Sequence, residues 1–345
     1  MVSSFPELEQ TFADQTTTSI SVANPFIQFS NQLDVVTRLI TLTTDKTVEA
    51  AAVLSGGYST RLFFLHSYTK LQLRNLHLTR GDCTEHQFGS GGVIYVGPGA
   101  ELIMNSVSIT ASRAERGGAV YAIGSSSVIA IDCMLDSNDA DAGGAFFVND
   151  AVVDLSSCTM TSNSADWGGA VYVSDLSTVT AAGCVMSTNT AFWGGGLYAQ
   201  DDSTIIATEC TMNSNVAYGG GGAVSATDDS NVTATECTMS SNSAHSGGAI
   251  YTAGEGTIFA VSGCLLTSNF AQTGGALETL GSVIVTLSDC VIKLNRAAKV
   301  QICRCRPLYD DPLLFDQLLT IYWTNSCFTG WWSACSIEQL SGLRA

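Results

Sequence analysis

Carboxylates recur in the middle of the sequence and could bind a metal ion. Asp175, Asp202 and Asp229 follow one another every 27 residues. Hard cations such as Ca²⁺ take oxygen ligands of this kind, so these three residues are candidate calcium ligands. The other members of this acidic set are Asp150, Asp201, Asp228 and Glu255. No EF-hand loop and no glycine-rich calcium nonapeptide is present, so a solvated acidic edge is the other interpretation.

Aromatic residues form a second recurring set that could bind sugar rings. The candidate contact residues are Tyr121, Phe147, Tyr172, Tyr198 and Tyr251, with Val224 in the same place between the last two, and Trp167 and Trp193 just before glycine pairs. If Val171 and Leu197 point inward, the neighbouring tyrosines point outward. The row is therefore either an exposed platform for a ligand or a set of cross-strand pairs that stabilise a sheet.

The residues that catalysis would need are few. Asp136, Asp139 and Asp141 are the one dense group of acids, and general acid–base chemistry needs carboxylates that converge on one pocket. His245 stands alone beside a glycine pair and is interpreted as a turn residue. Cys83 and His86 lie in an inserted segment, GDCTEHQF, that we expect to be a solvated loop. No nucleophile elbow, P-loop or zinc motif appears.

The elements that position these residues are copies of one repeat. Seven cysteines are spaced by 25, 26, 26, 27, 27 and 26 residues, an asparagine follows five residues after each, and glycine pairs begin ten residues after the first six. The cysteines are Cys133, Cys158, Cys184, Cys210, Cys237, Cys264 and Cys290. The asparagines are Asn138, Asn163, Asn189, Asn215, Asn242, Asn269 and Asn295. A fixed period of this size indicates one supersecondary unit stacked on itself.

The unit is built from strands. Apolar residues alternate with small or polar ones around each cysteine, as Val179, Ala181 and Met186 do around Cys184, which is the pattern of strands with one buried face. We predict an all-β, right-handed parallel β-helix of about ten coils, each of about 26 residues. Equivalent residues then form ladders, in which asparagine amides bond from coil to coil. The cysteines stack as small buried thiols, or take some disulfide or metal role.

The repeat resembles that of the chlamydial polymorphic outer-membrane proteins, which pairs GGA(I/L/V) with FxxN. GGAV at 168–171, GGAI at 247–250 and GGAL at 274–277 match the first motif, and MxxN or LxxN stands for the second. The resemblance covers roughly residues 107–298. It implies a pectin-lyase-like β-helix and a surface-exposed adhesin. The family's adhesins are carried by a membrane barrel, for which the residues after Asn295 are too few.

Charge is distributed unevenly and restricts the partners. The chain holds 31 acidic and 14 basic residues. The span 117–292 has 17 acids and no Lys or Arg, which leaves 14 acids and 14 bases elsewhere. Nucleic acid and anionic membrane surfaces are poor partners for such a surface. A carbohydrate or a protein surface is the expected partner.

The two ends differ from the repeats. Residues 1–20 carry Phe5, Leu8 and Phe12 at helical spacing, which predicts a short amphipathic helix that caps the solenoid. We divide the chain into this cap, a β-helix over 21–298 with regular repeats over 107–298, and an atypical tail or cap over 299–345. The apolar stretch 318–337 covers the open edge or forms a transmembrane tail. The resemblance implies a location outside the cell or at its surface, and since no signal peptide is visible, an intracellular location is the alternative.

These observations predict a non-catalytic solenoid with an extended acidic, aromatic-lined surface for adhesion or recognition, without a cofactor unless calcium binds. The alternative is a polysaccharide lyase or hydrolase of the pectin-lyase-like class. The lyases of that class use a cationic base, so such a site would lie near Arg80, Arg113 and Arg116. A purely structural spacer is the third interpretation.

Overall fold

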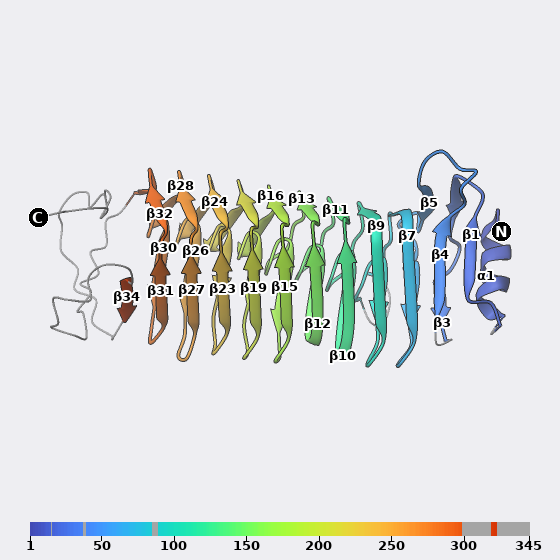
Figure 1. The fold of residues 1–345 in the computed structure, drawn as a ribbon, viewed down its shortest axis with the longest axis horizontal. Coiled ribbons are helices and arrows are strands. Elements are labelled where there is room, and N and C mark those ends of the chain that lie inside the picture. The colour runs from blue at the N-terminus through green and yellow to red at the C-terminus, as the bar shows by residue number, and fades with distance from the viewer. Residues whose placement is uncertain (15, 37–38, 85–88, 299–318, 323–345) are drawn as a thin grey trace, which may run out of the picture.

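The protein is a parallel β-helix of about ten coils. The computed structural model describes residues 1–14, 16–36, 39–84, 89–298 and 319–322. Successive coils stack along one axis from the N-terminal to the C-terminal end (Figure 1). The predicted all-β solenoid is confirmed. Most of the tail predicted over 299–345, including its tryptophans, lies outside the described residues.

Each regular coil contributes strands to four columns, named here in the order in which the chain meets them after the glycine pair. The first column holds β3 (Leu33–Val35), β6 (Phe63–Leu65), β8 (Ile94–Val96), β14 (Val171–Ser174), β18 (Leu197–Ala199), β22 (Val224–Ala226), β26 (Ile250–Ala253) and β30 (Leu277–Leu280). The second holds β1 (Ser19–Val22), β4 (Ile40–Thr44), β15 (Thr178–Ala182), β19 (Thr204–Thr208), β23 (Asn231–Thr235), β27 (Ile258–Ser262) and β31 (Ile284–Ser288).

The third column holds β2 (Phe26–Gln28), β5 (Ala52–Ser55), β11 (Met134–Asp136), β13 (Thr159–Thr161), β16 (Val185–Ser187), β20 (Thr211–Asn213), β24 (Thr238–Ser240), β28 (Leu265–Thr267) and β32 (Val291–Lys293). The fourth holds β17 (Thr190–Trp193), β21 (Val216–Gly220), β25 (Ser243–Ser246), β29 (Phe270–Thr273) and β33 (Arg296–Ala297). Four long strands each serve two columns: β7 (Lys70–Thr79), β9 (Glu101–Thr110), β10 (Val120–Ile131) and β12 (Phe146–Ser156).

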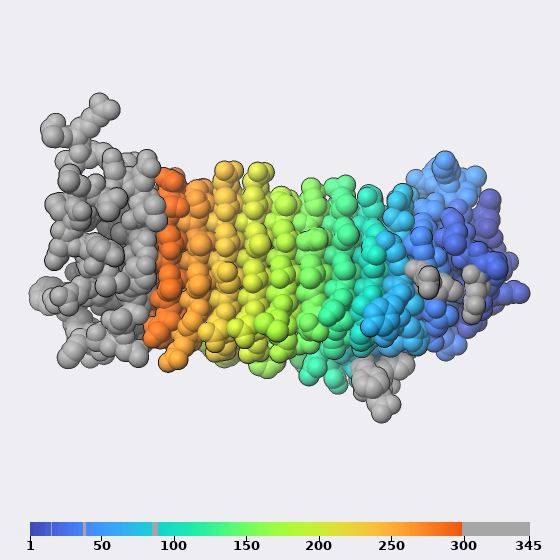
Figure 2. Space-filling view, turned by 60° about the horizontal axis from the view of Figure 1, so that its bottom comes forward, coloured from blue at the N-terminus to red at the C-terminus, as the bar shows by residue number. Residues whose placement is uncertain are grey.

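Neighbouring coils pair in parallel and in register, so equivalent residues lie directly above one another. The inward residues form one continuous apolar core along the solenoid, and Val179, Ala181 and Met186 in one coil are fully buried. The stacked coils appear as parallel ridges in the space-filling view (Figure 2).

A helix closes the N-terminal end. α1 (Phe5–Ala13) lies across the first coils (Figure 1) and buries Phe5, Leu8 and Phe12. The Phe5 ring packs against Phe29 with 4.8 Å between the centroids. This confirms the predicted amphipathic helix. At the other end, β34 (Leu319–Tyr322) pairs antiparallel with β31.

Buried asparagines join the coils at one turn. The Oδ1 of Asn215 accepts hydrogen bonds from the backbone nitrogen of Asn189, at 3.0 Å, and from its Nδ2, at 3.1 Å. The Nδ2 of Asn215 donates to the carbonyl oxygen of Met186 at 2.8 Å and to the next asparagine. The same pattern runs from Asn138 to Asn295. These side chains satisfy the backbone groups that the turn would otherwise bury without partners.

The turns before the cysteines and asparagines use left-handed backbone. Ser214, the residue before Asn215, has φ +57°, and Glu209, the residue before Cys210, has φ +53°. Single residues with positive φ bend the chain without ending the sheet. The glycine pair makes the sharper corner, since Gly168 has φ +63° and a Cβ on Gly169 would lie 2.3 Å from the carbonyl oxygen of Gly195.

The cysteine ladder consists of free thiols. All seven are unpaired, and only Cys290, in the last coil, is partly exposed. The Sγ of Cys210 donates to the carbonyl oxygens of Ala181 and Thr208, both at 3.4 Å. Burial raises the pKa of the Cys290 thiol. The ladder is therefore a set of small core thiols without disulfides in this structure.

We predict that Asn215→Ala destabilises the protein by about 3 kcal/mol, because it leaves two donors of Asn189 and the carbonyl of Met186 buried without partners. Chemical denaturation monitored by circular dichroism measures this. Asn231 is exposed and its side chain makes no hydrogen bond in the described residues, so Asn231→Ala is the matched control. Equal effects of the two substitutions would contradict a structural role for the ladder.

Candidate functional site

The aromatic row is a stack of rings outside the main core. Its rings belong to Phe64, Tyr95, Tyr121, Phe147, Tyr172 and Tyr198, here called the aromatic ladder, and neighbouring centroids lie 4.5 to 5.6 Å apart with interplanar angles of 3° to 27°. Each ring therefore covers the face of the next. Tyr172 is 9% exposed and Phe147 6%. This burial favours the second interpretation of the row, cross-strand pairs that stabilise the sheet, over an exposed platform, because the spacing of the coils matches ring-stacking distance.

The row also breaks at a different residue from the one predicted. Tyr198 pairs with Ser225, and Ser225 pairs with Tyr251. The fourth-column strand of that coil, β21, contains an extra residue that shifts the register. The position fourteen residues after the ladder cysteine is therefore Val224 in this coil, and its side chain is buried in the core instead of lying in the row. Tyr251 packs instead against Trp193, with 5.1 Å between centroids.

A second set of residues stacks at the corner just before the glycine pairs. Arg116 pairs with Ala142, Ala142 with Trp167, and Trp167 with Trp193; we call these four the corner column. Trp167 is 42% exposed. The guanidinium of Arg116 lies 5.7 Å from the centroid of the Phe147 ring. Ala142 is the one small side chain of the four, so it leaves a gap between Arg116 and Trp167.

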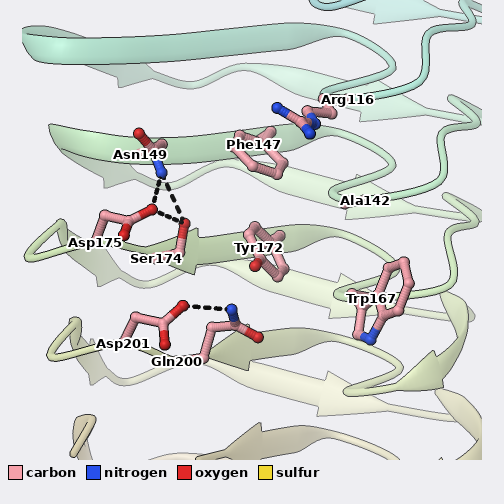
Figure 3. Close-up of a pocket in the computed structure, with 10 residues that line it drawn as sticks. All are labelled: Arg116, Ala142, Phe147, Asn149, Trp167, Tyr172, Ser174, Asp175, Gln200 and Asp201. Carbon is pink, nitrogen blue, oxygen red and sulfur yellow. Dashed lines mark hydrogen bonds between the residues drawn. The ribbon is translucent and has the colours of Figure 1, made fainter. Parts of the chain in front are cut away.

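A depression of about 280 Å³ occupies this gap. Its floor is formed by Phe147 and Tyr172, and three members of the corner column, Arg116, Ala142 and Trp167, stand along one side (Figure 3). We call it the Trp167 groove. The opposite side is polar and is lined by Asn149, Ser174, Asp175, Gln200 and Asp201.

Hydrogen bonds fix the polar side of the groove. Asn149 Nδ2 donates to Asp175 Oδ2 and, at 3.2 Å, to Ser174 Oγ. Gln200 Nε2 donates to Asp201 Oδ2 at 2.5 Å. Burial raises the pKa of Tyr172 to about 12, so its phenol stays neutral. The groove thus presents an indole on one side and amide and carboxylate groups on the other.

The acidic residues predicted as calcium ligands lie in turns and do not form a cluster. Asp202 and Asp229 have φ +58°, and Asp175 has φ +53°. Asp is among the residues that adopt this left-handed conformation most readily. The backbone nitrogen of Leu176, rather than that of Asp175, donates a hydrogen bond to the next coil. Its acceptor is the carbonyl oxygen of Asp201, at 3.1 Å. Nowhere in the described residues do three His, Cys, Asp or Glu side chains form a group able to hold a metal, so the three predicted calcium ligands are not brought together.

The dense acidic group is divided by the fold. Asp141 stacks between Glu115 and Asp166, with backbone N–O distances of 2.9 Å on both sides. Its pKa is raised, first by partial burial and then by the charges of Asp166 and Glu115. The sequence indicated Asp141 through its neighbours Asp136 and Asp139. Glu115 and Asp166 were missed, although each lies one repeat away.

The proposed cationic region is also divided. Arg80 and Arg113 lie over the ring of Tyr58, at 6.0 and 5.6 Å from its centroid. Of the three predicted arginines, Arg116 alone lines the Trp167 groove. Cys83 is 1% exposed, so it is a core residue, not part of a solvated loop, and residues 85–88 lie outside the described residues. His245 lies in β25, not in a turn.

One exposed aromatic set was missed. Phe192, Tyr218 and His245 lie in the fourth column, each three residues after a ladder asparagine. Phe192 is 49% exposed and Tyr218 67%. The sequence does place these three rings at a fixed distance from the ladder asparagines. The same position is occupied by Asp141 and Asp166 in the earlier repeats, so it does not indicate an aromatic row.

The comparisons agree with this architecture. The family model for a right-handed beta helix region matches residues 68–225. The Chlamydia polymorphic membrane protein repeat matches residues 236–253. A search of curated proteins and a search of solved structures found no match. No helix within the described part of the chain has the length and apolar character needed to cross a bilayer.

We predict that Asp141→Asn raises the melting temperature slightly at pH 7, because it removes repulsion from Glu115 and Asp166. The folded-state pKa of Asp141 is raised, so its ionised form opposes folding and its protonated form does not. The difference should therefore disappear as the pH falls below 3.8, the ordinary pKa. Thermal denaturation at several pH values measures it. Asp154→Asn, at an exposed acid of β12, controls for net charge, and a gain that is independent of pH contradicts the prediction.

Proposed function

We propose that this right-handed parallel β-helix protein, which carries the Chlamydia polymorphic membrane protein repeat, is a non-catalytic recognition protein that binds carbohydrate in the Trp167 groove. The observation that carries this proposal is the exposed indole of Trp167 opposite a fixed set of amide and carboxylate groups. Pyranose rings combine an apolar face with hydroxyl groups at the edge. Such a ligand matches a site with one aromatic and one polar side.

The bound sugar would rest on Trp167, since the rings of the aromatic ladder cover one another. Its hydroxyls would form hydrogen bonds with Asn149 and Asp175, which lie in neighbouring coils, and with Gln200 and Asp201 in the coil after them. The ladder supplies a stiff floor, and only the edges of Phe147 and Tyr172 line the site. Affinity in this proposal therefore comes from one indole and a few hydrogen bonds, which is typical of weak recognition that gains strength through several contacts.

Charge and family support a location at the cell surface. The central span has 17 acids without a Lys or Arg, so we expect nucleic acid and anionic membranes to be excluded. The matching repeat is named for membrane proteins of Chlamydia. We propose on that basis that the solenoid faces the outside of a cell, where its length presents the groove to glycans.

A polysaccharide-cleaving enzyme is the second candidate. The observation in its favour is that Arg116 and the acids Asp175 and Asp201 line one depression. Proton abstraction needs a general base within hydrogen-bond reach of the proton, and a carboxylate is one of the groups that can serve. The same residues would then be needed for turnover, and not only for binding.

The test of the proposed function is binding to a panel of soluble polysaccharides, measured by isothermal titration calorimetry. Trp167→Ala should weaken binding tenfold or more, because a tryptophan at the centre of an interface contributes about 2 kcal/mol or more. Ala142→Trp should also remove binding, because it fills the groove with a side chain that the corner column already accommodates at 167 and 193.

The control is Tyr68→Ala, which removes an aromatic ring that is 81% exposed and outside the groove. It should leave binding unchanged. Unchanged affinity after both Trp167→Ala and Ala142→Trp would exclude the groove as the site. The same mixtures are assayed for shortened chains, and cleavage that is lost in Arg116→Ala would favour the enzyme.

A further inference from the structure

The outward face of the fourth column is an open surface with its own architecture. Alanines occupy the inward position of β17, β21, β25 and β29 and are buried: Ala191, Ala217, Ala244 and Ala271. Two rows point outward on either side of them. One consists of Thr190, Val216, Ser243 and Phe270, and the other of Phe192, Tyr218, His245 and Gln272.

The aromatic rings of this face are uncovered, unlike those of the aromatic ladder. Tyr218 is 67% exposed and Phe270 48%, against 5% to 9% for the buried ladder rings from Tyr121 to Tyr198. Within the described coils, neither Tyr218 nor Phe270 contacts another ring. A groove of about 270 Å³ lies between them, over Ala217 and Ala244. The face thus offers ring surfaces that the ladder does not.

The polar groups that line the groove on this face come from Ser243, His245 and Gln272. None of the eight outward residues from β17 to β29 is Asp, Glu, Lys or Arg. The side chains of His245 and Gln272 make no hydrogen bond inside the described part of the chain, and both line the groove. A ligand in the groove therefore finds donors and acceptors beside apolar rings, and the groove lining includes no Lys or Arg. An exposed cation, Arg296 of β33, lies beside Phe270 at the edge of the face.

The size of the face distinguishes between possible occupants. Four strands at about 4.8 Å spacing and four residues at about 3.3 Å each give a plane of roughly 14 by 13 Å. That is about 200 Å², whereas a stable protein interface buries about 800 Å² per partner. A second copy of the chain would therefore need contacts that this face does not supply. A few sugar units fit the same dimensions.

We propose that the outward face of the fourth column is a second binding site, which takes a neutral polysaccharide chain. Sugar rings stack on Tyr218 and Phe270, and their hydroxyls bond to His245, Gln272 and Ser243. The edge of the site lies beside the corner column, where Phe192 packs edge-on against Trp193 at 5.7 Å. The inference goes beyond the Trp167 groove and does not depend on it.

The experiment titrates the full chain with cellohexaose and chitohexaose as neutral probes and with oligogalacturonate as the anionic probe. The double variant Tyr218→Ala, Phe270→Ala should bind the neutral probe at least tenfold more weakly, and Tyr218→Phe should retain binding because the ring remains. Tyr68→Ala should leave binding unchanged, and the anionic probe should bind more weakly than the neutral probes, because no Lys or Arg lines the groove. Unchanged melting temperatures verify that the variants fold.

The outcomes separate this site from the groove. If both sites take one probe, the stoichiometry is two, and either Trp167→Ala or the double variant reduces it to one. Neutral-chain binding that only Trp167→Ala removes overturns the second site and leaves the proposed function intact. Absence of neutral-chain binding overturns the second site as well. So does a concentration-dependent dimer in light scattering that Phe270→Ala abolishes, because a second copy would then be the occupant.

Discussion

The fold depends on one requirement: the buried backbone of each turn must find its hydrogen-bond partners in the adjacent coil. The ladder asparagine satisfies this requirement: the amide of Asn215 accepts from and donates to the preceding coil and also donates to Asn242 in the next coil. A coil of a different length at this point would leave several buried donors unsatisfied, at about 1–3 kcal/mol each. Extra residues are therefore found away from the ladder, as in β21.

The same register determines what the surface can do. Equivalent residues stack at the distance at which aromatic rings touch. In a continuous row of flat rings, each ring therefore covers the face of its neighbour, and no ring face is left for a ligand, as in the aromatic ladder. Open aromatic surface remains where the row is interrupted. Ala142 provides that interruption beside Trp167, and Ser243 and His245 separate rings in the fourth column. Small or polar residues within otherwise aromatic columns thus mark the sites.

The fold could be predicted from the sequence because its pattern is repeated. The sites were harder to predict, because they depend on contacts between side chains of neighbouring coils. Alternation around Cys184 and the offset to Asn189 identify the strands and the ladder, because each column averages over several copies. The burial of Tyr172 was one of two interpretations of the sequence, and the choice between them depends on the ring one coil away and on the corner column beside it. Left-handed Ser214 and Glu209 carry no residue signature like that of glycine, so those bends were not predicted.

The in-register pairing of coils has a consequence for how such a protein changes length. A segment that runs from one ladder asparagine to the residue before the next ladder asparagine is one whole coil, so its two ends lie at equivalent positions in neighbouring coils. Its duplication or loss restores every parallel pair and every asparagine bond, so whole coils are the units in which the gene can grow or shrink. The ends impose the limit, because α1 fits the first coils through Phe5 and Phe29 and caps no other. Distance along the solenoid can thus vary by recombination while the local chemistry of each groove is inherited intact.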